Sequence, residues 1–385
     1  MAMREQLNPN VHSLKRSAIR EFSKLAADTP GCIRLTLGEP DFTTPGNISD
    51  AAISSLKNGE THYISNSGSA DLRQEVSRYE KSRNGLVYEM NEVIITAGAT
   101  EALFISLLGI IEQGDEVIIP YPAFVLYEEI VHLCGGTVVP LDTSDCEFQI
   151  RSDRLNKLIT DRTKAIILNS PNNPTGCVYD AQSLNAVRNF VAGKEIFVLC
   201  DDVYRQLCFT GEYHSFAEFE ELREQIVVIQ SFSKPYAMTG WRMGYLMADR
   251  SITERLELIH QYDIVSTPSL FQKACIEALS YDPSIMIGTY RGRRDYICGA
   301  LSSAGLDFTV PEGTFYVFPS IQKYGITSKE FCTRLITEAG VAVTPGGAFG
   351  LDDHIRISYC CSMDDIKEGI LRLEGFIRKI SSESR

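Results

Sequence analysis

The chain has 385 residues, 44% of them hydrophobic and 23% charged, with a formal net charge of −13. This composition is ordinary for a globular protein with a large core, and the acidic balance argues against a nucleic-acid or anionic-membrane partner. The 11 cysteines include no Cys-x-x-Cys pair, residues 1–20 contain no secretion-type apolar stretch, and no run is long enough for a membrane span, so we expect a cytoplasmic protein with free thiols and no metal site.

The first segments combine a helix, a strand and two loops. Residues 17–27 have the spacing of an amphipathic helix, with apolar side chains including Ile19 and Phe22 on one side. A short strand over 33–37 leads into Gly38-Glu39-Pro40-Asp41-Phe42, an ordinary turn by composition. Further on, Tyr63 precedes a glycine by five residues and a Leu-Arg pair by nine. Taken alone, this tyrosine is typical of half-buried packing.

From residue 93 onward, strands alternate with helical stretches such as 101–111 and 184–192. Five β-branched or apolar runs end at Thr96, Ile119, Leu168, Cys200 and Ile229. A polar, aromatic or glycine-rich cluster follows each run at once. Ligands of open α/β sheets bind outside the carboxyl ends of the strands. The pattern therefore predicts a mostly parallel sheet with a ligand site at one edge.

Several of the clusters that follow these runs contain candidate ligand contacts. Ala99 and Thr100 stand at a helix start, where free N–H groups and the helix dipole favour phosphate. Phe124 follows the second run as either a core aromatic or a ligand contact. Asn173 lies in an Asn-Pro-Thr-Gly turn. Asp201 ends a hydrophobic strand, where a carboxylate needs a partner such as a protonated ring nitrogen.

The fifth run leads into Ser231-Phe232-Ser233-Lys234, and Arg242 follows in the same loop. A lysine amine attacks carbonyls only when deprotonated, which cationic or apolar surroundings favour. Hydroxyls and an arginine together suit a phosphate. A lone Ser-x-x-Lys is typical of a surface loop, but the complete spacing favours a cofactor with both an aldehyde and a phosphate, as in pyridoxal phosphate.

The C-terminal third begins with helical stretches over 251–301 that break at residues 281–283. Short apolar runs at 308–310 and 315–318 and an amphipathic run over 366–380 follow. Arg356 stands alone in a short apolar strand, where a guanidinium needs an anionic partner. That partner is either a structural carboxylate or a bound one.

The stretch 231–244 resembles the lysine-site pattern of class I/II aminotransferases, and Asn-Pro-Thr-Gly at 173–176 is a second motif of that family. The resemblance extends over nearly the whole chain and is strongest to the aminotransferase A and aromatic-aminotransferase branch. It implies an α/β fold-type I architecture. A large domain, residues 46–284, would carry a mostly parallel central sheet, and residues 1–45 and 285–385 would form a smaller α+β domain.

The resemblance also implies roles for individual residues. Lys234 would hold pyridoxal phosphate as an aldimine and carry protons, while Asp201 would keep the ring nitrogen protonated. Asn173 and Tyr204 would bond the ring oxygen, and Phe124 would stack on the ring. Gly38 and Arg356 would place the substrate carboxylate, with Asn173 beside them. The remaining cofactor contacts would come from Ala99, Thr100, Ser231, Ser233, Arg242 and, across a homodimer interface, Tyr63.

The implied reaction moves the amino group of an aromatic or other bulky L-amino acid to 2-oxoglutarate. Thr100 stands where one aspartate-specific branch has a lysine, so the acceptor's second carboxylate would face another cation such as Arg20, or water. Acylated diaminopimelate is a further possible donor. A Cβ–S lyase is the alternative, because the same cofactor shell serves it. A regulatory module that follows a DNA-binding domain is disfavoured because few residues precede Leu35.

Overall fold

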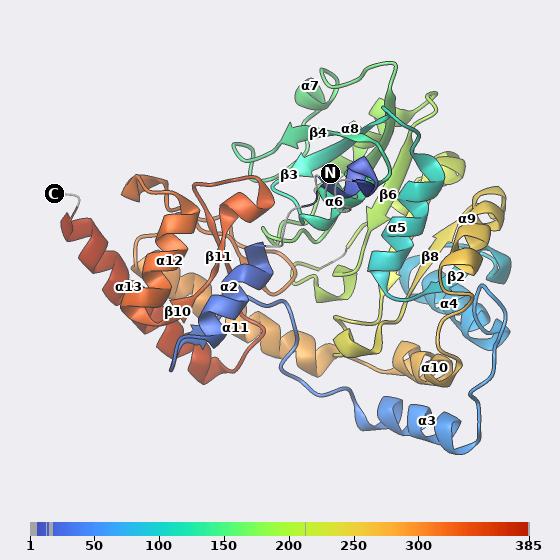
Figure 1. Cartoon of the computed structure of the whole chain (residues 1–385), viewed down its shortest axis with the longest axis horizontal. Coiled ribbons are helices and arrows are strands. Elements are labelled where there is room, and N and C mark those ends of the chain that lie inside the picture. The colour runs from blue at the N-terminus through green and yellow to red at the C-terminus, as the bar shows by residue number, and fades with distance from the viewer. Residues whose placement is uncertain (1–5, 13, 15–17, 212, 384–385) are drawn as a thin grey trace.

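The structure, a computed structural model, describes residues 6–12, 14, 18–211 and 213–383. A seven-stranded sheet forms its centre (Figure 1). In spatial order the strands are β2 (Val93–Thr96), β8 (Gly244–Ala248), β7 (Ile226–Ser231), β6 (Phe197–Asp201), β5 (Thr163–Asn169), β3 (Glu116–Tyr121) and β4 (Thr137–Asp142). Strand β8 runs antiparallel to both of its neighbours, β2 and β7, and all the other neighbouring pairs are parallel. The prediction of an α/β fold with a mostly parallel sheet is confirmed, although β4 and β8 were not among the predicted strands.

Both faces of this sheet are buried except at the edge strand β4, which explains why the other strands are apolar runs without alternation. Ile118 packs into one core, whereas its neighbours Val117 and Ile119 pack into another. The second of these cores contains residues of α5 (Ala99–Ile110), α6 (Leu126–Leu133) and α9 (Arg250–Asp263). The first contains residues of α3 (Gly46–Lys57), α4 (Ala70–Asn84), α7 (Ser152–Leu155), α8 (Ala181–Val191) and α10 (Gln272–Ser280).

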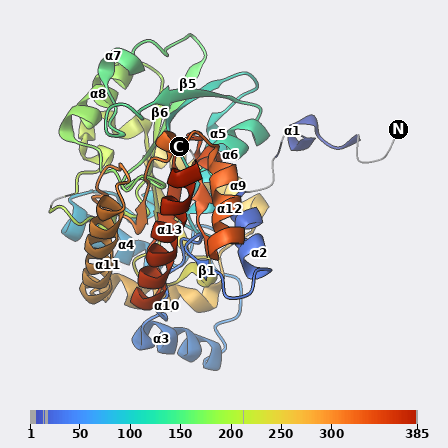
Figure 2. The same ribbon diagram turned by 90° about the vertical axis from the view of Figure 1, so that its left-hand side faces the viewer.

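A third core lies beside the sheet, toward the end of the molecule that carries the C-terminus (Figure 1). Its helices are α2 (Ala18–Ala27), α11 (Ser284–Ser303), α12 (Ser328–Ala339) and α13 (Met363–Glu383). Figure 2 shows the last three together on one side of the molecule. The strands here are β1 (Ile33–Arg34) with β10 (Val341–Ala342), and β11 (Thr344–Pro345), β12 (Ile355–Ser358) and β9 (Tyr316–Val317).

Several predicted bounds differ from the structure in this third core. Strand β1 has two residues instead of the five over 33–37, because it pairs only with the two-residue β10. Residues 308–310 form no strand. Helix α2 begins at Ala18, and the predicted first residue, Ser17, lies outside the described residues. The division into domains of 46–284 and the two chain ends stays a prediction.

One short helix precedes these elements. Helix α1 (Pro9–His12) is a single turn near the N-terminus. None of the helices in the described ranges is long and apolar enough to cross a membrane.

Candidate active site

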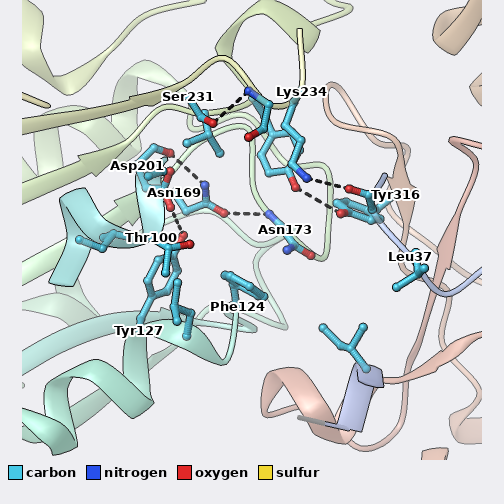
Figure 3. Close-up of a pocket in the computed structure, with 18 of the residues that line it drawn as sticks. Leu37, Thr100, Phe124, Tyr127, Asn169, Asn173, Asp201, Ser231, Lys234 and Tyr316 are labelled. Atoms are coloured by element: carbon cyan, nitrogen blue, oxygen red, sulfur yellow. Dashed lines mark hydrogen bonds between the residues drawn. The ribbon is translucent and has the colours of Figure 1, made fainter. Parts of the chain in front are cut away.

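A cavity of about 320 Å³ opens where the carboxyl ends of the parallel strands meet (Figure 3). Of the predicted site residues, all but Tyr63 line it: Gly38, Ala99, Thr100, Phe124, Asn173, Asp201, Tyr204, Ser231, Ser233, Lys234, Arg242 and Arg356. They come from segments far apart in sequence, and the sheet brings them together. Tyr63 lies elsewhere, with 87% of its surface exposed.

Lys234 follows β7 and reaches across the cavity. Its Nζ donates to the carbonyl oxygen of Gly38 at 2.7 Å. Burial, reinforced by the positive charges of Arg242 and Arg356, lowers the pKa of Lys234 to about 8. A sizeable fraction of this amine is therefore neutral near physiological pH, and the neutral form is the nucleophile.

Asp201 is the last residue of β6 and is only 4% exposed. Its Oδ2 accepts from the Tyr127 hydroxyl at 2.6 Å, and its backbone carbonyl accepts from Asn169 Nδ2 at 2.9 Å. Its Oδ1 is buried and has no hydrogen-bond partner in the part of the chain that the structure describes. Burial is the main cause that raises the pKa of Asp201 to about 6. A buried acceptor without a donor is costly, so this oxygen fits a donor supplied by a ligand.

Asn173 and Arg356 form the opposite part of the same network. Asn173 donates its backbone N–H to Asn169 Oδ1 at 2.9 Å, and its Oδ1 accepts from Arg356 Nη1 at 2.9 Å. Arg356 also donates from Nη2 to the Thr36 carbonyl at 2.6 Å, while its Nε is buried and unpaired. Tyr316 packs on the guanidinium, with its ring centre 4.3 Å from Cζ.

The sequence is compatible with either a structural carboxylate or a bound one as the partner of Arg356. Arg356 is 1% exposed, and no aspartate or glutamate pairs with it within the described ranges. Neutral oxygens and aromatic rings do not neutralise a buried cation, so this guanidinium still favours an anionic partner. The geometry therefore favours a bound carboxylate.

A cradle of donors lies where β2 turns into α5. Gly98 adopts φ +78°, and a Cβ atom there would stand 2.7 Å from Arg242 Nη2. The missing side chain lets the guanidinium lie against the helix start, whose first N–H groups have no partner within the helix. Ser231 closes the cradle, and its Oγ accepts from Ser233 N at 3.1 Å. Cation, hydroxyls and helix dipole together suit a phosphate.

Three residues that line the site were not predicted from the sequence: Tyr127, Asn169 and Tyr316. The Tyr316 hydroxyl lies 3.2 Å from that of Tyr204. Asn169 directly follows a predicted strand, so the rule that marked the other strand ends could have marked it as well. Tyr127 and Tyr316 carried no comparable signal, because their roles depend on which way a helix and a short strand face.

Apolar side chains and one cation complete the lining. Ile19 and Arg20 come from α2, beside a group of leucines that consists of Leu37, Leu103 and Leu126. Phe22, which the helical spacing places on the same side of α2 as Ile19, is 3% exposed in the third core and does not line the cavity.

The chain matches known proteins along almost its full length. The family model described as aminotransferase class I and II matches residues 30–373. The chain is 38% identical to a probable N-acetyl-LL-diaminopimelate aminotransferase of Bacillus subtilis strain 168, covering 98% of this chain and 97% of the relative. It is 34% identical to aromatic-amino-acid aminotransferase 2 of Thermococcus litoralis, covering 97% and 98%. A crystal structure of an aspartate aminotransferase from Thermotoga maritima superposes with a TM-score of 0.93 at 32% identity, covering 97% of this chain and 100% of the other.

Proposed function

The chain belongs to the class I and II aminotransferase family, and we propose that it moves the amino group of an aromatic or other bulky L-amino acid to 2-oxoglutarate. The family makes it a pyridoxal-phosphate-dependent transaminase of fold type I. The substrate proposal rests on one observation: apolar Ile19, Leu37, Leu103 and Leu126 line the cavity, while Thr100 is uncharged.

The residues present fit pyridoxal phosphate on two counts. Asp201 Oδ1 is a buried acceptor that lacks a donor, and the turn at Gly98 leaves room beside Arg242 that a side chain would fill. When bound, pyridoxal phosphate supplies a carbonyl that accepts an amino group and a ring that withdraws electrons. Phosphate contacts are assigned to Ala99, Thr100, Ser231, Ser233, Arg242 and, in a homodimer, the partner subunit's Tyr63.

Lys234 and Asp201 are the proposed acid–base residues. The pKa of Lys234, lowered to about 8, allows its amine to bind the cofactor carbonyl and then to move a proton at the substrate Cα. Asp201 would hold a proton on the ring nitrogen by a charge-assisted hydrogen bond. Asn173 and Tyr204 would contact the ring oxygen, and Phe124 would pack against the ring.

Arg356 and the Gly38 backbone are the proposed contacts of the substrate α-carboxylate. Support comes from the buried guanidinium without a carboxylate partner and from the 2.7 Å bond that brings Gly38 to Lys234. The second carboxylate of 2-oxoglutarate needs a further cation, and exposed Arg20 of α2 lines the cavity at its mouth. An exposed cation binds this carboxylate weakly, so an apolar donor can share the same space.

A half-reaction screen tests the donor preference. Each amino acid is added alone to the enzyme, and conversion of the bound cofactor to its amine form is followed by absorbance. We expect conversion with phenylalanine, tyrosine or acylated diaminopimelate, slower conversion with aspartate, and none with D-phenylalanine as the stereochemical control. Fast conversion with aspartate and none with the bulky donors would overturn the preference without touching the transaminase assignment.

A further inference from the structure

A buried histidine outside the cavity connects two parts of the chain that the proposed function uses. His260 lies on α9 and is 0% exposed. Its Nδ1 lies 2.5 Å from Glu101 Oε1, and its Nε2 lies 2.8 Å from the carbonyl oxygen of Asn66. A carbonyl oxygen can only accept, so Nε2 carries a hydrogen. The short contact at Nδ1 requires a second proton between the ring and the carboxyl group.

The Glu101 end of this bridge fixes the phosphate cradle. Glu101 stands in the first turn of α5, directly after Ala99 and Thr100. Its other oxygen, Oε2, accepts from the backbone N–H of Ala97, in the turn that leads out of β2. The carboxyl group therefore clamps the turn from both sides. A negative charge in this turn also opposes a bound phosphate, unless a proton donor such as His260 offsets it.

The Asn66 end fixes the segment that carries Tyr63. Asn66 Nδ2 donates to the carbonyl of Val265 at 2.7 Å, and Ile95 N, in β2, donates to the carbonyl of Ser67 at 2.9 Å. The segment is thus held against α9 and the sheet. Tyr63, three residues earlier, is 87% exposed and outside the cavity of its own subunit.

We propose that His260 is a positioning residue that holds both phosphate-binding groups at once: the start of α5 for its own site and Tyr63 for the partner subunit's site. This inference rests on the proposed function, which assigns both groups to the phosphate. The competing explanation is that His260 only stabilises the fold. The two explanations differ in whether a substitution of His260 specifically weakens the binding of the phosphate group.

Binding to the cofactor-free protein separates them. Dissociation constants for pyridoxal phosphate and for pyridoxal, which lacks the phosphate, are measured by fluorescence in wild type and in His260→Leu. In His260→Leu we expect the dissociation constant of pyridoxal phosphate to rise about tenfold, because a charge-assisted hydrogen bond is lost. The dissociation constant of pyridoxal should change less than twofold. His260→Gln can fill one of the two bonds and should lie between, which covers the case that the leucine variant fails to fold.

Two further variants make the comparison strict. Thr253→Val is the matched control, because Thr253 is also buried on α9 but bonds to the Asn91 carbonyl, away from the cradle. Glu101→Gln is the conservative partner, since an amide keeps an acceptor for Ala97 and a donor for His260, and its loss of affinity should be smaller than that of His260→Leu. Thr253→Val should bind pyridoxal phosphate within about threefold of wild type. The inference is overturned if His260→Leu loses as much affinity for pyridoxal as for pyridoxal phosphate. It is also overturned if Thr253→Val loses as much affinity for pyridoxal phosphate as His260→Leu does.

Hybrid dimers test the two ends of the bridge separately. Only a subunit that retains Lys234 gives the visible absorbance of covalently held cofactor. Pairing His260→Leu with Lys234→Ala damages the α5 side of that site, whereas pairing wild type with the double variant His260→Leu/Lys234→Ala damages only the Tyr63 side. We expect weaker cofactor retention in both hybrids than in wild type paired with Lys234→Ala.

The outcomes remain distinguishable from failure of the proposed function. Loss in only one hybrid, or in neither, overturns the joint role of His260. Wild-type protein that binds no pyridoxal phosphate would instead overturn the proposed function itself.

Discussion

Replacing Asp201 with asparagine should stabilise the cofactor-free protein while slowing the enzyme. The pKa of Asp201 is raised from 3.8 to about 6, because burial disfavours the charged carboxylate more than the hydrogen bond from Tyr127 favours it. The folded protein therefore holds this proton more tightly than the unfolded chain does. Stability is lost as the pH rises from about 4 through 6.

The size of this effect follows from the difference between the two pKa values. A shift of about two units, at roughly 1.36 kcal/mol per unit, gives about 3 kcal/mol of unfolding free energy. Asparagine resembles the neutral acid and keeps an acceptor for Tyr127. It should therefore match wild type below pH 4 and exceed it by about 3 kcal/mol above pH 7.

The assay is urea unfolding of cofactor-free protein at pH 5 and pH 8. Asp295→Asn serves as the control, because its side chain is 61% exposed and stays in water in both states. A midpoint for Asp201→Asn that is unchanged or lower at pH 8 would refute the burial argument. In the loaded enzyme the lost charge-assisted bond, roughly 1.5–3 kcal/mol, should cut turnover by about tenfold to a hundredfold. Near-normal turnover would refute the assignment of Asp201 to the ring nitrogen.

Three further outcomes are expected. Lys234→Ala should lose both turnover and the visible absorbance of covalently held cofactor, and retention of either contradicts its role. Arg20→Gln should raise the KM for 2-oxoglutarate by up to about fivefold, as expected for an exposed ion pair, with the KM for phenylalanine unchanged as the internal control; an unaltered KM for the acceptor excludes Arg20. Sedimentation should find activity only in a dimer, and Tyr63→Phe should weaken cofactor retention there; a fully active monomer contradicts the shared site.

Strand ends were the part of the site that the sequence could predict. Asp201, Ser231 and Thr100 each stand next to an apolar run, and the parallel arrangement brings such ends to one edge whatever the order of the strands. Residues that contact a strand-end residue from another element could not be predicted from the sequence. Tyr127 contacts Asp201 from α6, and the spacing of α6 does not say which side chain turns toward β6.

The fold shows the same limit. Strand β8 is an apolar run like its neighbours, and nothing in that run shows that it lies antiparallel between β2 and β7. Strand β1 ends after two residues because β10 offers no longer partner. The partner of β1 lies about 300 residues later in the chain, and β2 lies about 150 residues before β8, so local pattern alone cannot fix these features.

The division of labour within the cavity bears on substrate choice. Asp201, Asn173 and Lys234, the proposed cofactor contacts, stand on or soon after strands of the central sheet. Neighbouring groups fix the first two, because Asp201 accepts from the Tyr127 hydroxyl and the backbone of Asn173 donates to Asn169. Helix α2 contributes Ile19 and Arg20 from a separate element, anchored by buried Phe22 and by a 3.1 Å hydroxyl contact between Ser23 and Thr36.

A change at the exposed side of α2 can therefore alter the substrate without disturbing the cofactor shell. Relatives named for aspartate, aromatic and acylated diaminopimelate substrates fit this arrangement, since an aspartate enzyme superposes on this chain with a TM-score of 0.93. Apolar pockets discriminate by only about 1–3 kcal/mol per methylene, so few substitutions suffice. The donor preference of this chain is accordingly expected to respond to substitutions at Ile19, Arg20 and Leu37, and not to substitutions at the residues proposed to hold the cofactor.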